Sequence, residues 1–96
     1  MHVSADTDAL NASAQMLSGA ADALSGDMDT LAAASLTMRA GWAGDAQAAW
    51  TRRHAQIDST MRDKAATLRL TSQRVSQYAQ ELAQADADGA HAVLGL

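Results

Sequence analysis

Gly41-Trp42-Ala43-Gly44-Asp45 lies near the middle of a sequence of 96 residues and divides it into two long segments of similar pattern. A glycine in the left-handed conformation closes many helices, and an acidic residue suits the first turn of a helix. We therefore expect a first helix to end near Gly41, residues 41–44 to form a turn, and a second helix to begin at about Asp45. Two helices joined by so short a turn lie antiparallel.

The composition favours helices along the whole chain. There is no proline, the strongest helix breaker, and no cysteine or phenylalanine, whereas helix-forming alanine is abundant. A chain of this length has room for one domain with a modest core. We predict an all-α fold, with a single helical-hairpin domain over residues 1–96.

Before the turn, apolar residues recur with heptad spacing. One row, at steps of seven, consists of Val3, Leu10, Leu17, Leu24, Leu31 and Met38. The second row, four residues behind the first, consists of Ala14, Ala21, Met28 and Ser35. This spacing is typical of helices that pack along a seam. It predicts a helix from about residue 7 to residue 40.

The segment after the turn carries two rows of its own. One consists of His54, Met61, Leu68, Val75 and Leu82, and the other of Trp50, Ile57, Lys64, Thr71, Tyr78 and Ala85. They predict a helix over about residues 45–86. Lys64 and Thr71 are polar residues in an otherwise apolar row. One interpretation is that they fix the register of the seam. The other is that the Lys64 side chain only extends its charge to the solvent at the edge of the seam. The pattern loosens around Gly89, so we expect a flexible tail over residues 87–96.

The apolar stripes of both helices are too wide for one hairpin to cover. The predicted seam, within the hairpin and in a dimer, comprises Leu10, Leu17, Leu24, Met28, Leu31, Met38, Trp50, Ile57, Met61, Leu68, Val75 and Leu82. Met16, Leu36 and Leu70 lie outside the rows and widen the stripes further. The first helix is acidic and the middle of the second is basic, which favours antiparallel pairing. We predict a four-helix bundle made of two hairpins.

A row of small residues also repeats every seven positions in the first helix. It consists of Ala12, Gly19, Gly26, Ala33 and Ala40. Glycine inside a helix costs about 1 kcal/mol relative to alanine. Either the close approach of another helix compensates for this cost, or the helix tolerates it.

Several classes of function are disfavoured by what the sequence lacks. The net charge of −4 argues against nucleic acid as a ligand. His2, His54 and His91 show no metal-binding spacing, and no nucleophile or phosphate-binding motif is present. We expect no enzyme, no cofactor, no metal and no small-molecule substrate. Without a membrane span or a standard signal peptide, the protein either stays in the cytoplasm or leaves by a route that reads the folded chain.

Trp42-Ala43-Gly44, between two long amphipathic helices in a chain of just under one hundred residues, resembles the WXG-100 family. This family comprises the early-secreted-antigen-like substrates of type VII secretion in bacteria, and the resemblance covers the whole chain. It implies a hairpin that forms a homodimer, or a heterodimer with a related WXG-type protein, and that is exported folded by an ATPase-driven membrane complex. It also implies that Trp42 and Gly44 form the bend of the export signal.

The resemblance implies two further sites in the second half of the chain. The family carries a tyrosine followed four residues later by an acid. Here Tyr78 is followed three residues later by Glu81, so either this pair is a variant export signal or the working signal belongs to the partner. The apolar end of the chain, Val93, Leu94 and Leu96, resembles the segment that docks on the secretion ATPase.

We expect a protein that is made in the bacterial cytoplasm, secreted without a cleavable signal peptide, and active through protein–protein contacts. Two other interpretations stay open: a targeting chaperone for a larger toxin, and a cytoplasmic adaptor that is not exported. Trp42 either only caps the apolar end of the hairpin or also serves export, and Tyr78 serves either packing or recognition. Contact with membranes is left open, as is the choice between homodimer and heterodimer.

Overall fold

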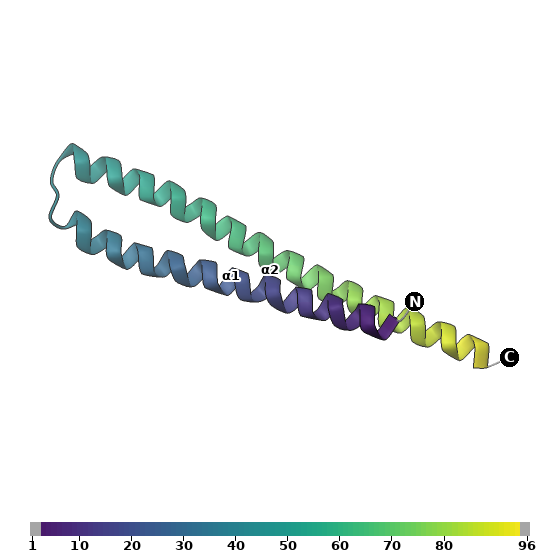
Figure 1. Ribbon diagram of the computed structural model, residues 1–96. Coiled ribbons are helices and arrows are strands. Elements are labelled where there is room, and N and C mark those ends of the chain that lie inside the picture. Colours follow the sequence, from purple (N-terminus) through teal and green to yellow (C-terminus); the bar gives the residue numbers. More distant parts are fainter. Residues whose placement is uncertain (1–2, 95–96) are drawn as a thin grey trace. The chain divides into compact units, whose positions relative to one another are not determined.

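The computed structural model describes the backbone of residues 3–94 and the side chains of residues 4–89. Over this range the chain forms two helices, α1 (Val3–Arg39) and α2 (Asp45–Leu94), and no strand (Figure 1). A short connection over residues 40–44 joins them. The predicted all-α helical hairpin is therefore confirmed.

Both helices are longer than the sequence predicts. α1 begins at Val3 rather than at about residue 7. α2 continues past residue 86 to Leu94, so the predicted end of the helix near residue 86 is wrong. A single glycine such as Gly89 costs a helix only about 1 kcal/mol, and the absence of proline leaves nothing stronger to end it.

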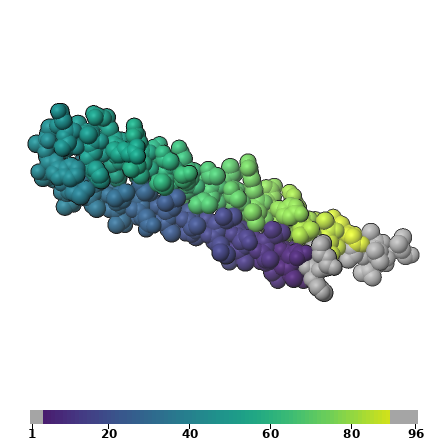
Figure 2. Space-filling model, turned by 45° about the horizontal axis from the view of Figure 1, so that its top comes forward, coloured from purple at the N-terminus to yellow at the C-terminus, as the bar shows by residue number. Residues whose placement is uncertain are grey.

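The chain divides into two compact units, each of which contains a segment of α1 and a segment of α2. The turn unit is Gly19–Leu68. The terminal unit combines the residues up to Ser18 with those from Arg69 onward. Within each unit, hydrogen bonds join side chains of one helix to the other helix, so the two segments pack side by side (Figure 2).

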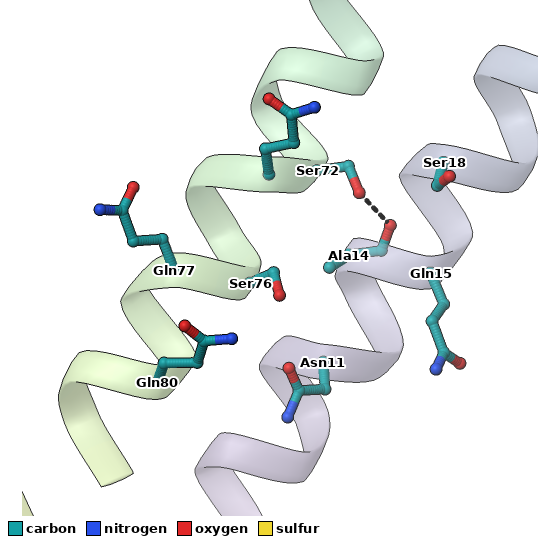
Figure 3. Close-up of a pocket in the computed structure, with 9 residues that line it drawn as sticks. Asn11, Ala14, Gln15, Ser18, Ser72, Ser76, Gln77 and Gln80 are labelled. Carbon is teal, nitrogen blue, oxygen red and sulfur yellow. Dashed lines mark hydrogen bonds between the residues drawn. The ribbon is translucent and has the colours of Figure 1, made fainter. Parts of the chain in front are cut away.

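The core of the terminal unit is built from small side chains. Ala14 of α1 is buried, as are Ser72 and Ala79 of α2. Because these residues are small, the helices approach closely enough for the Ser72 hydroxyl to donate a hydrogen bond to the Ala14 carbonyl oxygen over 2.6 Å (Figure 3). This bond gives the buried hydroxyl a partner, which a buried polar group needs.

The core of the turn unit follows the same plan. Ala21, Met28 and Ser35 of α1 are buried, and Ala65 is buried on α2. Ser35, which is only 2% exposed, accepts a hydrogen bond from Trp50 on the opposite helix. The second row predicted for α1 is thus the innermost one, whereas Leu24 in the first row is half-buried.

One row predicted for α2 is wrong by a single position. The buried row contains Ala65, Ser72 and Ala79, whereas Lys64 and Tyr78 in the predicted row are exposed. The large side chains of that row predict a core, but the buried residues of α2 are all small. Successive residues of a helix point about 100° apart around its axis, so a row that is one residue away from the buried one lies outside the contact between α1 and α2.

The predicted seam residues therefore fall into three groups. Met28 alone is buried. Half-buried positions beside the small-residue core are Leu10, Leu17, Leu24, Trp50, Met61, Leu68, Val75 and Leu82. Leu31, Met38 and Ile57 are exposed, so the hairpin does not cover them.

Candidate functional site

The two tryptophans meet beside the turn. The ring centroids of Trp42 and Trp50 lie 5.6 Å apart with an interplanar angle of 82°, an edge-to-face contact. Trp50 also donates from Nε1 to the Ser35 hydroxyl oxygen over 2.7 Å. Trp42 thereby rests on a side chain that is itself tied to α1. Trp42 nevertheless keeps 39% of its surface exposed, so it is available to a partner as well as to the fold.

Gly44 supplies the backbone conformation that starts α2. Its φ of +68° lies in the left-handed region that other residues rarely adopt, and its carbonyl oxygen accepts a hydrogen bond from the Ala48 amide. The prediction that Gly41 takes this conformation is wrong, because Gly44 is the glycine with positive φ among the described residues. Two of the last carbonyl oxygens of α1 instead accept hydrogen bonds in the turn, that of Met38 from the Gly41 amide over 3.4 Å and that of Arg39 from the Trp42 amide over 3.0 Å.

Side chains of α2 form hydrogen bonds with the last residue of α1. Gln47 donates from Nε2 to the Arg39 carbonyl oxygen over 3.0 Å, and Arg39 donates from Nη1 to the Thr51 hydroxyl oxygen over 3.2 Å. Asp45 lies in the first turn of α2, where its charge complements the helix dipole. These contacts tie the end of α1 to the first turns of α2.

The terminal unit carries an apolar groove of about 400 Å³ between the helices. Leu10 and Ala9 line it on α1, and Tyr78 and Leu82 line it on α2, with Asp6 at its edge. Tyr78 remains 55% exposed. The groove joins a half-buried leucine to an exposed aromatic ring, which suits contact with another apolar surface.

Tyr78 and Glu81 are both exposed and lie less than one turn apart on α2. No hydrogen bond or ion pair joins either side chain to another residue in the described part of the chain. The Tyr78 ring lines the apolar groove with part of its surface and exposes the rest to the solvent, where Glu81 is also exposed. They are accessible for recognition, as the export-signal interpretation needs.

A second groove in the terminal unit is polar (Figure 3). Its lining consists of Asn11, Ala14, Gln15, Ser18, Ser72, Gln73, Ser76, Gln77 and Gln80. None of these residues is charged, aromatic or large and apolar. The two grooves show that one side of the terminal unit suits apolar contact and the other suits water.

On one side of the turn unit, a network of ion pairs joins α1 to α2. Arg62 of α2 donates to Asp29 of α1 over 2.8 Å and to Asp58, one turn earlier on α2, over 2.9 Å. The hydrogen bonds to Asp58 and Asp29 raise the pKa of the Arg62 guanidinium. We call this side, where Asp29 and Arg62 meet, the ion-pair side.

The opposite side of the turn unit is apolar. A helix turns by about 100° per residue, and counting from buried Met28 and Ala65 places Leu31, Met38 and Ile57 away from the ion-pair side. These three residues are 39%, 46% and 37% exposed. We call the surface that contains Leu31, Met38 and Ile57 the apolar side.

The row of small residues in α1 faces outward. A Cβ added to Gly19 or Gly26 would meet no atom within 4 Å. No close approach among the residues that the structure describes therefore explains the two glycines.

Three further predictions concern the C-terminal docking segment, metal sites and membrane spans. The backbone of α2 reaches Leu94, but the side chains of Val93 and Leu94, and all of Leu96, lie outside the described residues. Among the residues described, no three His, Cys, Asp or Glu side chains gather in a way that would hold a metal ion. Neither described helix has a stretch long and apolar enough to cross a membrane.

Comparison with models of known protein families, with curated proteins and with solved structures finds no match to this chain.

Proposed function

We propose that this chain is a WXG-type helical hairpin, exported by a type VII secretion system as a dimer and acting through protein–protein contacts. The observation that carries the proposal is the apolar side of the turn unit. Leu31, Met38 and Ile57 are exposed there although they repeat at the spacing of seam residues. Exposed apolar residues on one surface mark a site of association in a small protein.

The geometry of the bend supports the link to export. Trp42 and Gly44 have different tasks, since the Trp42 ring packs on Trp50 and the Gly44 backbone takes a positive φ. The bend thus uses an aromatic ring at position 42 for packing and a glycine at position 44 for the backbone conformation. The exposed part of Trp42 offers a surface to the secretion machinery. Tyr78 and Glu81 are exposed on α2 and offer a second surface.

The test is a secretion assay in a bacterium that carries a type VII system. We expect Trp42→Ala and Tyr78→Ala to lower the ratio of secreted to intracellular protein. Trp42→Phe and Tyr78→Phe are the matched controls, because they keep an aromatic ring at each site. Circular dichroism of each purified variant separates loss of export from loss of folding.

Two outcomes would contradict the proposal. The first is that the unchanged protein stays inside cells whose type VII system exports another substrate, which would favour the cytoplasmic adaptor. The second is that the purified chain stays monomeric both alone and with a related WXG-type protein. Unchanged secretion of both alanine variants would remove these two residues from the export signal.

A further inference from the structure

We infer that Ser35 is a positioning residue for export, which acts through Trp50 on the orientation of the Trp42 ring. The inference rests on the proposed function, because it takes Trp42 as part of the export signal. It goes further because it adds two residues to that signal that the secretion machinery need not touch. Ser35 is almost fully buried, and Trp50 is half-buried.

The orientation of the Trp42 ring depends on Trp50. Trp42 lies in the connection over residues 40–44, outside both helices. Its ring meets the Trp50 ring edge to face, a geometry in which aromatic rings attract each other beyond the burial of their surfaces. The direction in which the exposed part of Trp42 points therefore follows from where the Trp50 ring lies.

The place of the Trp50 ring depends in turn on Ser35. A side chain such as that of Trp50 has several staggered rotamers open to it, and the 2.7 Å hydrogen bond from Nε1 to the Ser35 hydroxyl oxygen favours the rotamer that makes this bond. The acceptor belongs to a short, buried side chain on a helix, so it has little freedom to move. Trp42 is thus held by a support that begins on α1.

Packing alone does not explain the hydroxyl group at position 35. Ala14 and Ala21 are buried in the same row of α1, and alanine differs from serine only by the missing oxygen. A buried hydroxyl group lowers stability unless it forms a hydrogen bond, so packing favours alanine at position 35. The bond from Trp50 gives the hydroxyl group a use that an alanine could not supply.

Other hydrogen bonds keep the same segments together without Ser35. Gln47 of α2 donates to the Arg39 carbonyl oxygen, and the Arg39 guanidinium donates to Thr51 of α2. Removing the Ser35 hydroxyl therefore should leave the end of the hairpin in place and release the Trp50 ring. A loss of export in a folded variant would then report the orientation of Trp42.

The test compares Ser35→Ala with Ser72→Ala in the secretion assay. Ser72 is also buried, and its hydrogen bond to Ala14 also joins the two helices, but it lies in the terminal unit. One net hydrogen bond changes the balance between two conformations by about 5-fold, so we expect Ser35→Ala to lower the ratio of secreted to intracellular protein by up to this factor. Ser72→Ala should be exported like the unchanged chain.

A double variant tests whether Ser35 acts through Trp50. Trp50→Phe removes the donor of the hydrogen bond, so Ser35→Ala should cause no further loss of export when it is added to Trp50→Phe. Helix content by far-ultraviolet circular dichroism shows that each variant is folded. An added loss in the double variant would mean that Ser35 acts by another route, and would overturn the inference.

Near-ultraviolet circular dichroism follows the tryptophan rings themselves. Trp42→Ala gives the spectrum without the ring pair, and we expect the spectrum of Ser35→Ala to move toward it while that of Ser72→Ala does not. An unchanged tryptophan spectrum in Ser35→Ala, or equal loss of export in Ser35→Ala and Ser72→Ala, would overturn the inference.

The same assay separates this inference from the proposed function. Normal export of Trp42→Ala would overturn the role of Trp42 in the export signal, and with it the role of Ser35. Impaired export of Trp42→Ala together with normal export of Ser35→Ala would overturn the inference alone.

Discussion

The hydrogen bond between Trp50 and Ser35 allows a direct test of what holds the turn unit together. The indole Nε1 donates over 2.7 Å to a hydroxyl oxygen on a residue that is almost fully buried. Ser35→Ala removes the acceptor and leaves the indole donor without its partner. Trp50→Phe removes the donor but keeps an aromatic ring beside Trp42. The double variant removes both groups.

The expected magnitudes follow from burial. A hydrogen bond contributes about 1 kcal/mol net, and a buried donor left without a partner costs about 1–3 kcal/mol. Ser35→Ala should therefore lower the free energy of unfolding by about 1–2 kcal/mol. Trp50→Phe should cost more, because the smaller ring also makes less contact with Trp42. The double variant should cost about 1 kcal/mol less than the sum of the single variants.

Urea unfolding followed by circular dichroism measures these free energies. All variants are compared at one protein concentration, because the stability of a dimer depends on concentration. Ser59→Ala is the control, since Ser59 is an exposed serine on α2 and should show no coupling to Trp50→Phe. A coupling free energy near zero between Ser35 and Trp50 would show that this hydrogen bond does not tie the helices together.

Three further predictions concern packing and charge. Gly19→Ala and Gly26→Ala should each stabilise the protein by about 1 kcal/mol; a lower thermal midpoint would show that another surface packs on these glycines. Ala65→Leu should destabilise by about 1–3 kcal/mol because Ala65 is buried, whereas Ala66→Leu, at an exposed neighbour, should change stability by less than about 0.5 kcal/mol. Equal losses in thermal unfolding would contradict the assigned core. Arg62→Gln should shift the unfolding midpoint only slightly, and the shift should shrink at high salt; a large, salt-independent loss would contradict an exposed ion-pair network.

Much of the fold could be predicted because it depends on local pattern. The heptad rows, the lack of proline and the paired glycines around Trp42 predict two antiparallel helices and the position of the turn. The end of α2 could not be predicted in this way. Gly89 weakens the helix only slightly, and the structure continues α2 to Leu94.

The candidate site was predicted less completely. The sequence pointed to Trp42 and Gly44, but not to the edge-to-face contact with Trp50 or to the bond from Trp50 to Ser35. The buried row of Ala65, Ser72 and Ala79 was missed. Its spacing of seven was visible in the sequence, but small residues give a weaker signal than the large ones beside them.

Two amphipathic helices around a Trp-Ala-Gly bend follow from the sequence alone, because helix propensity and periodicity are properties of neighbouring residues. The row that lies innermost depends instead on how the two helices pack against each other. Small side chains let the helices approach closely, so Ala79 and Ser35 are buried while Tyr78 and Ile57 stay exposed. Which stripe is covered depends on the distance between two segments far apart in the chain, and local pattern does not contain that distance.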